Sequence, residues 1–345
     1  MWSVTVYVVR FTCVSRRTSL AALAVLATCA AHAQSTQSIR IAAAPQTIDL
    51  KFDWGAVLDA NVVAVREEFQ TREGSERVSK LEASFHLHAV REGDRYALTF
   101  TDLTMSLDEQ PVHEAIQPGL LGPITGLVLS YDIAGNGDFI GLRDFDRLQS
   151  FAQRSYLSQN DRMRSEERPS QRESDQAMTS GGSREVLQLD ASRTWGAVAG
   201  LWTGLKLTEG KPRLSDSAVT VPVINSPLTL HTTFEIVRRE ECAAGERRRA
   251  CVRLRATSHP DPLQLAAALE RLKQRTGDVG PTSGAMNVED RFELLTEPDT
   301  LKPRWVQWIR GADVSGYQDG ANRVQGRQST RTTMTFDYSG KRGTK

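Results

Sequence analysis

The sequence predicts a mainly β protein of the α+β class, with an antiparallel sheet that is curved or forms an open barrel and a few packing helices. Runs that alternate apolar and polar residues follow one another directly, which is typical of antiparallel sheets. Only three segments have helical periodicity. Each half of the chain has strands followed by a helix, so two related β-plus-helix halves are an open alternative.

The N-terminus has the features of a signal peptide over residues 1–33. Arg16 and Arg17 precede an uncharged run that starts at Leu20, and the run ends in the small residues that signal peptidase requires. The run is about 12 residues long, whereas a membrane span needs about 20. We therefore expect cleavage after Ala33 and no transmembrane span in the mature chain.

An exported chain of this kind is expected in the periplasm, with release from the cell or a lipid anchor as alternatives. The anchor would be Cys29, because Leu26-Ala27-Thr28-Cys29 approximates a bacterial lipoprotein site. Thr28 is larger than the Gly or Ala usual at that place. The residues before Arg16 are apolar, so a start at Val14 instead of Met1 also stays open.

The charge of the chain argues against a nucleic-acid partner. The whole chain has a net charge of +1, and residues 1–33 hold three of the basic residues and no acidic one. The mature chain is therefore slightly acidic, without the basic excess that nucleic-acid binding needs.

Residues 34–158 are predicted to form an N-terminal β-rich half. Residues 78–90 alternate, with apolar side chains at odd positions and polar ones at even positions, which is the pattern of a half-buried strand. A partner strand follows from Tyr96, and its phase slips near Asp102, where we expect a bulge. Residues 134–137 (Ala-Gly-Asn-Gly) predict a hairpin turn, and residues 144–158 predict a helix.

Residues 159–184 lack apolar periodicity and are interpreted as a polar linker or mobile loop. The C-terminal β-rich half, residues 185–345, carries predicted helices near 191–205 and 261–276. The second helix has the clearer signals. Asp261 can cap it, and Pro262 suits its first position.

Two cysteines stay in the chain after cleavage, Cys242 and Cys251, and they are expected to form a disulfide in an oxidising compartment. The closed loop is short, so its stabilisation is about 2–3 kcal/mol. A regular ladder with the cysteines directly opposite would place Phe234 on the same face as Arg255. The apolar pattern places Phe234 with Ala256 instead, so we expect a bulge or a disulfide beyond the ladder.

Two features are weak candidates for a functional site. His86 and His88 lie on one face of a predicted strand and could bind a metal, but no third ligand is evident and a solvated face is the simpler interpretation. A set of arginines surrounds the cysteine hairpin and could contact anionic lipid head groups or an acidic partner, with an ordinary solvated hairpin as the simpler interpretation: Arg238, Arg239, Arg247, Arg248 and Arg249.

Motifs for nucleophilic catalysis, for phosphate binding and for metal-dependent hydrolysis are missing, so no catalytic residue and no cofactor is predicted. Whether the chain is an enzyme stays open, with a non-catalytic role favoured. The first hypothesis is an envelope protein that binds a lipid or another apolar ligand. The second is an assembly factor that contacts another envelope protein through the arginine-rich hairpin. The third is a hydrolase without a recognisable motif. A largely filled interior would favour the second hypothesis over the first.

Overall fold

The fold is known from a computed structural model. It describes residues 45–72, 75–111, 130–143, 182–221, 226–242, 250–276, 285–319 and 322–338. The expected signal peptide at 1–33, the expected helix at 144–158 and residues 159–181 of the expected linker lie outside these ranges. Residues 182–184, which were also assigned to that linker, instead begin a helix.

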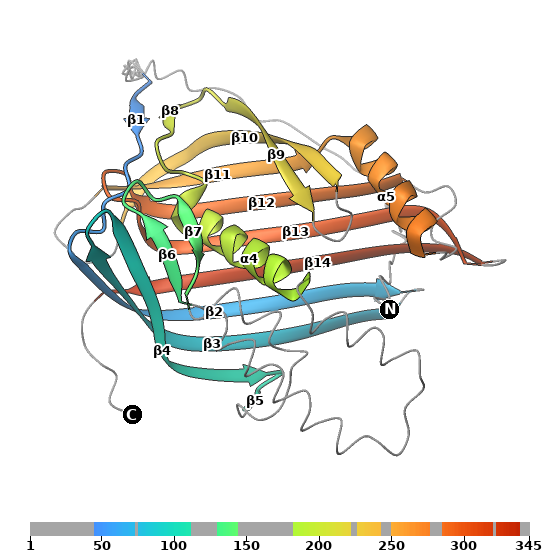
Figure 1. The fold of residues 1–345 in the computed structure, drawn as a ribbon, viewed down its shortest axis with the longest axis horizontal. Helices are drawn as coiled ribbons and strands as arrows, with labels where there is room; N and C mark the ends of the chain where they lie inside the picture. Colours follow the sequence, from blue (N-terminus) through green and yellow to red (C-terminus); the bar gives the residue numbers. More distant parts are fainter. Residues whose placement is uncertain are drawn as a thin grey trace, which may run out of the picture.

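The helices and strands, labelled as in Figure 1, have the following bounds. They are β1 (Thr47–Asp49), β2 (Val57–Arg72), β3 (Ser75–Glu92), β4 (Arg95–Leu107), β5 (Gln110–Pro111), β6 (Tyr131–Ala134), β7 (Phe139–Leu142), α4 (Gly182–Trp195), the π-helical turn η1 (Gly196–Gly200), β8 (Lys206–Thr208), β9 (Arg213–Val221), β10 (Ser226–Glu241), β11 (Ala250–Pro260), α5 (Pro262–Thr276), β12 (Ala285–Glu297), β13 (Lys302–Asp319) and β14 (Asn322–Asp337).

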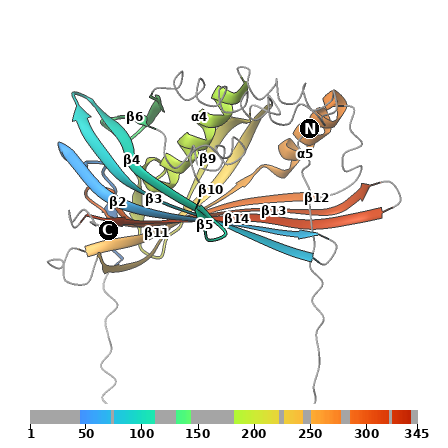
Figure 2. The ribbon, with the colours of Figure 1, turned by 90° about the horizontal axis from the view of Figure 1, so that it is seen from below.

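The described strands form a 12-stranded antiparallel sheet and a small two-stranded sheet of β1 and β8. The order in the large sheet is β7-β6-β4-β3-β2-β14-β13-β12-β11-β10-β9, with β5 added beside β4. Among the described strands the sheet is open, with β7 and β9 at its two ends, and it curves around the face that carries α4 and α5 (Figure 2). The predicted curved antiparallel sheet is therefore confirmed.

The first and last described long strands are neighbours, because β14 pairs with β2 along its length. Strands from both halves of the sequence thus belong to one continuous sheet (Figure 1). Residues directly opposite each other in a ladder share a face. The inward face can therefore be followed from Phe85 on β3 through Val62 on β2 to Phe336 on β14.

The alternation predicted for β3 is found. The side chains of Leu81, Phe85 and Leu87 are buried on the inward face, while His86 and His88 lie on the outward face. The expected bulge in β4 is also present. Its register against β3 shifts between Ser84 and His86, and Asp102 adopts a φ of 55°.

The first helix of the C-terminal half differs from the prediction. It runs from Gly182 to Trp195 and continues as η1 to Gly200, instead of spanning residues 191–205. Apolar periodicity starts only near Ala191, but the preceding part of the helix has no proline and includes the good helix formers of residues 184–185 and 187–189. The glycines at the two ends of η1 have low helix propensity, which is consistent with regular helix ending at Trp195.

The second helix is confirmed as α5. Asp261 Oδ1 accepts hydrogen bonds from the backbone N–H groups of Leu263 and Gln264, at 3.0 and 2.9 Å, as an N-cap should. Leu265 and Ala268 are buried in a small second core with Leu228 of β10.

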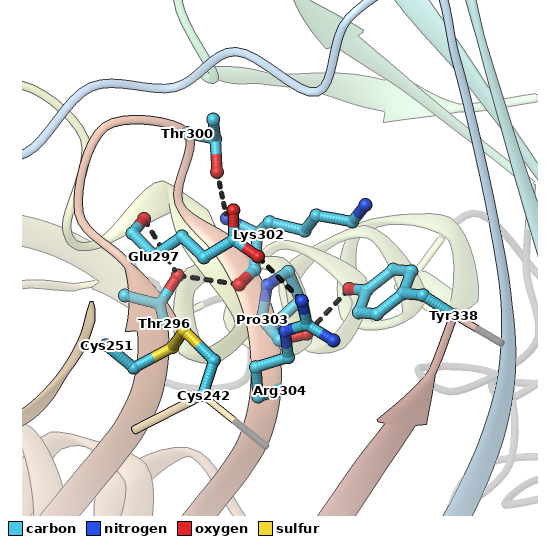
Figure 3. Close-up of a disulfide and its surroundings, with 9 residues drawn as sticks. All are labelled: Cys242, Cys251, Thr296, Glu297, Thr300, Lys302, Pro303, Arg304 and Tyr338. Atoms are coloured by element: carbon cyan, nitrogen blue, oxygen red, sulfur yellow. Dashed lines mark hydrogen bonds and ion pairs between the residues drawn. A yellow bond between two sulfur atoms is a disulfide. The ribbon is translucent and has the colours of Figure 1, made fainter. Parts of the chain in front are cut away.

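The disulfide between Cys242 and Cys251 is present (Figure 3). The β10–β11 register shifts between Ile236 and Arg238, and Cys242 lies beyond the last paired residues. The disulfide therefore lies only partly beyond the ladder, because Cys251 pairs with Glu240 within it, whereas the expected bulge is present. As a result Phe234 is opposite Ala256, and the apolar residues of both strands share the inward face.

A polar cluster holds the same end of the sheet together (Figure 3). Arg304 forms a buried ion pair with Glu297 at 2.7 Å, and the Tyr338 hydroxyl donates to the Pro303 carbonyl at 2.6 Å. The Lys302 ammonium lies 4.2 Å from the centre of the Tyr338 ring. Burial raises the pKa of the Tyr338 hydroxyl well above its usual value of 10, so it stays a donor at neutral pH.

Candidate functional site

An apolar pocket lies between the inward face of the sheet and the helical segment α4–η1. The sheet contributes Phe85 and Leu87 of β3, Leu98 and Phe100 of β4, Tyr131 of β6, and Met334 and Phe336 of β14. The helical segment contributes Thr194, Trp195 and Val198, and Trp54 comes from the loop before β2. None of these lining residues is charged.

Aromatic rings in edge-to-face contact form much of the pocket wall. The Phe85 and Phe100 ring centres are 5.3 Å apart at an interplanar angle of 78°, and Phe100 continues to Tyr131 at 5.5 Å. On the helix side, Trp54 and Trp195 are 5.3 Å apart at 70°. Such pairs stabilise the core by about 0.5–1.5 kcal/mol beyond their buried area.

The polar atoms of the two indoles are turned away from the pocket interior into backbone hydrogen bonds. Trp195 Nε1 donates to the Gly137 carbonyl at 2.8 Å, and Trp54 Nε1 donates to the Leu301 carbonyl at 3.2 Å. Both indoles are thus satisfied, which leaves their hydrocarbon surface for the pocket. The first of these bonds also fixes α4 to the β6–β7 hairpin.

The open space in the pocket is small, about 20 Å³. This is room for about one water molecule, whereas pockets for small molecules have roughly 300–1,000 Å³. The described interior is therefore largely filled, and a ligand of any size would have to displace part of the wall.

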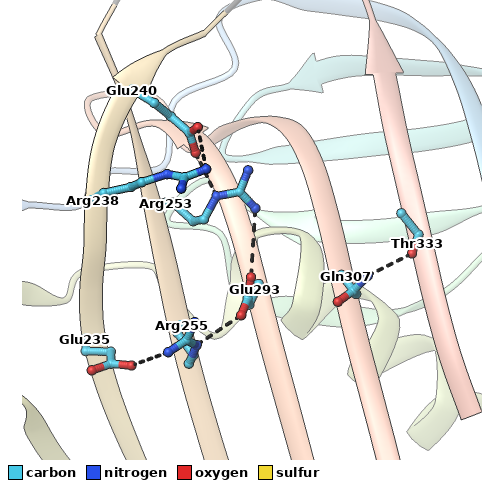
Figure 4. Close-up of polar contacts among 8 residues, drawn as sticks. All are labelled: Glu235, Arg238, Glu240, Arg253, Arg255, Glu293, Gln307 and Thr333. Atoms are coloured by element: carbon cyan, nitrogen blue, oxygen red, sulfur yellow. Dashed lines mark hydrogen bonds and ion pairs between the residues drawn. The ribbon is translucent and has the colours of Figure 1, made fainter. Parts of the chain in front are cut away.

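The outward face of the sheet has the opposite character, as Figure 4 shows. Arg255 bridges Glu235 and Glu293 across three strands, with both separations at 3.0 Å. Nearer the sheet end, Arg253 contacts Glu240 at 2.7 Å, and Glu240 also contacts Arg238. These ladders are partly exposed, whereas the apolar pocket lies on the inward face.

His86 and His88 lie on this outward face beside Asp59 of β2. His88 Nδ1 is 2.7 Å from Asp59 Oδ1, and His86 Nε2 is 3.1 Å from the same oxygen. The hydrogen bond from His88, followed by that from His86, lowers the pKa of the Asp59 carboxyl. Within the described residues, no group of three His, Cys, Asp or Glu side chains is arranged to bind a metal.

The arginines of the cysteine hairpin are only partly described. Arg238 pairs with Glu240 at 3.1 Å, and Arg239 pairs with Glu209 of the β8–β9 turn. Arg247, Arg248 and Arg249 lie outside the described residues. The described part of the hairpin therefore has balanced charge.

The pocket was not identified from the sequence, although part of its wall was. The alternation of residues 78–90 and the partner strand from Tyr96 were predicted, and the structure places Phe85 and Phe100 on the same face of these strands. Trp54, Trp195 and Phe336 come from distant parts of the chain, and no local pattern indicates that they meet.

No protein-family model matches the chain, and no curated protein matches it. Among solved structures, a lipovitellin structure described by its lipid–protein interactions is similar over 83% of this chain and 25% of the lipovitellin chain, with a TM-score of 0.40 and 8% identity. A DUF1329 family protein from Desulfovibrio piger is matched over 81% of this chain and 83% of its own, with a TM-score of 0.12 and 11% identity.

This chain thus spans about a quarter of the lipovitellin chain. Both TM-scores are too low to establish a shared fold. No helix within the described ranges is long and apolar enough to cross a membrane.

Proposed function

We propose that this chain is a non-catalytic envelope protein that binds a lipid or another apolar ligand on the inward face of its curved sheet. The observation that carries the proposal is the pocket beneath α4–η1, whose lining is aromatic and aliphatic and contains no charged side chain. Pockets for apolar ligands have this composition. On the outward face, β10, β11 and β12 carry an ion-pair ladder in place of an apolar lining.

Because the open space is small, binding requires the helical segment to move. The strands of the wall are held by continuous backbone ladders, whereas α4–η1 is attached to the sheet through side chains such as Trp195 and Val198. Segments can open locally without global unfolding, and the cost rises with the apolar contacts that they bury. Opening here would have to part the buried contacts of Trp195 and Val198. The ligand chain then takes the place that Val198 and Trp195 fill in the closed form.

The proposal places the protein outside the cytoplasm, in the periplasm. Residues 1–33 support export by their signal-peptide pattern. The disulfide of Cys242 and Cys251 fits an oxidising compartment. Release from the cell and an anchor at Cys29 are the alternatives to a free periplasmic protein.

The second candidate function is contact with another envelope protein. The largely filled interior favours it, and so does β9, whose one described partner in the sheet is β10. Leu214 on this strand is 77% exposed. A strand edge of this kind can pair with a strand of another protein.

A substitution in the pocket tests the first proposal. Val198 lines the pocket and is only 7% exposed. Val198→Phe therefore places a ring in the space that the ligand would use. We expect affinity for the apolar dye diphenylhexatriene, measured by fluorescence titration, to fall at least tenfold, which is about 1.4 kcal/mol.

The matched control is Val63→Phe, which makes the same change on the outward face at a residue that is 52% exposed. It should bind the dye as the wild-type chain does. Thermal unfolding of both variants checks that the fold is intact, since overpacking costs about 1–3 kcal/mol. A folded Val198→Phe variant with unchanged dye affinity would contradict the proposal and favour the protein-partner candidate.

A further inference from the structure

The inward face of β14 changes from apolar to polar at Thr332. Phe336 and Met334 line the pocket, and Thr332 is the next inward-facing residue along the strand. Successive inward residues on a strand are roughly 6.6–6.8 Å apart. The polar position therefore lies at the margin of the apolar pocket.

Thr332 is 1% exposed, and its hydroxyl oxygen has no hydrogen-bond partner in the structure. A buried hydroxyl without a partner is unfavourable, and native proteins keep few of them. Each one that persists requires an explanation, such as an ordered water, an ion or a functional role. This hydroxyl is thus placed to bind a group from outside the chain.

Thr332 has one charged and one aromatic ladder neighbour on the same face. It lies opposite Arg66 of β2 in the ladder, and opposite Trp308 of β13 on its other side. One inward step further along β14, Thr330 lies opposite Glu68 and Arg310. Opposite side chains in a ladder are in contact range. Arg66, Glu68, Thr330 and Arg310 form a polar band beside Thr332, while Trp308 packs against the hydrophobic core.

The charges in the polar band are balanced. Arg66 pairs with Glu68 at 2.9 Å, and Arg310 forms a two-pronged pair with Asp290 at 2.7 and 3.0 Å. A ligand with a net charge would have to displace one side chain of an ion pair in order to contact its partner. A net-neutral polar group can bind beside them without separating either pair.

We propose that the ligand is an amphiphile whose hydrocarbon chain occupies the aromatic pocket and whose net-neutral head group hydrogen-bonds to the Thr332 hydroxyl beside Arg66. This inference rests on the proposed function, because it names the ligand class of the same site. The head group is zwitterionic, as in a phosphocholine, or uncharged, as in a monoacylglycerol. Both have the acceptor oxygens that a threonine hydroxyl needs.

The test compares four probes on the full mature chain. Diphenylhexatriene reports the apolar pocket alone. Three competitors with the same chain length are then added below their micelle-forming concentrations. They are monopalmitoylglycerol with an uncharged head, palmitoyl lysophosphatidylcholine with a zwitterionic head, and palmitate with an anionic head. We expect at least one of the two neutral amphiphiles to displace the dye at a concentration about fivefold to tenfold lower than palmitate does.

The variant Thr332→Val keeps the shape of the side chain and removes the hydroxyl. It should bind the neutral amphiphiles about fivefold to tenfold more weakly, which is the effect of one lost hydrogen bond, and bind diphenylhexatriene unchanged. Its melting temperature should stay the same or rise, because an unpaired buried hydroxyl is gone. Thr332→Ser should restore the preference. The control Thr335→Val makes the same change on the outward face, where Thr335 is exposed.

Palmitate as the strongest competitor, or equal binding of neutral amphiphiles to the wild-type chain and Thr332→Val, would overturn this inference. The second result would mean that a buried water satisfies the hydroxyl. A different result would contradict the proposed function itself, namely that the wild-type chain does not bind diphenylhexatriene at all.

Discussion

Single residues at the β6–β7 hairpin decide how the helical segment is attached to the sheet. Gly137 has a φ of +93°, and its carbonyl accepts the hydrogen bond from Trp195. A Cβ at Gly137 would lie 2.7 Å from Thr203 Oγ1 and 2.9 Å from Phe52 Cγ. Glycine is required here both by the backbone conformation and by the close packing.

Gly137→Ala should therefore destabilise the fold by about 2–4 kcal/mol, from the cost of a positive φ and from the clash. Urea unfolding followed by circular dichroism measures this. Gly93→Ala is the matched control, because Gly93 also has a positive φ but has nothing within 4 Å of the added Cβ. Gly93→Ala should lower the free energy of unfolding by less, because it adds no clash. Equal decreases in the two variants would show that packing at Gly137 is not tight.

At the scale of elements, the attachment of α5 depends on a polar contact with β9 and β10. His231 Nδ1 is 2.8 Å from Asp216 of β9, and its Nε2 is 3.8 Å from Asp261, the cap of α5. The hydrogen bond with Asp216 is the largest cause that raises the pKa of His231. Backbone donors of α5, with Gln264 first, lower the pKa of Asp261.

These two shifts favour opposite ends of the pH range. The raised pKa of His231 stabilises the fold fully below about pH 6.5, its unfolded value. This stabilisation is lost as the pH rises through the folded pKa. The lowered pKa of Asp261 stabilises the fold above about pH 3.9, and that contribution is lost as the pH falls through its folded pKa. The contact is therefore strongest between these limits.

We expect an NMR titration of the His231 ring to give a pKa above 6.5. Asp216→Asn should lower it more than Asp261→Asn, because Asp216 is in hydrogen-bond contact and Asp261 is more distant. Asn is also a good N-cap, so Asp261→Asn removes the charge at this position without removing the cap of α5. A larger shift from Asp261→Asn would contradict this account.

At the scale of the whole molecule, pairing of β14 with β2 joins the two ends of the described chain into one curved sheet. The inward face is apolar beneath α4–η1, polar around Thr332, and apolar again in the small core beneath α5. The outward face carries ion-pair ladders (Figure 4). A molecule with this asymmetry can hide an apolar chain while it presents a polar surface to water.

Native mass spectrometry of the protein purified from its own producer tests export and ligand binding together. We expect a chain of residues 34–345 that lacks the two hydrogens of the disulfide, with an additional amphiphile that is released on denaturation. A mass that includes residues 1–33 would exclude cleavage of the signal. A lipid covalently linked at Cys29 would establish the anchored alternative, and a bare chain would favour a protein partner.

The sequence by itself determined the features that depend on neighbouring residues. The alternation of β3, the bulge at Asp102, the cap of α5 at Asp261 and the disulfide were all predicted correctly. Each follows from side-chain periodicity, from turn and cap chemistry, or from the small number of cysteines. The start of α4 was predicted wrongly, because the first turns of that helix lack the apolar periodicity on which the prediction relied.

Only the tertiary structure decided where the pocket lies and what adjoins it. Trp54, Trp195 and Phe336 meet because β14 pairs with β2 and because α4 packs across the sheet. The unpaired hydroxyl of Thr332 likewise results from the burial of a threonine whose local sequence is an ordinary strand. Contacts between residues far apart in the chain depend on strand order and on burial, and local patterns do not encode either of these.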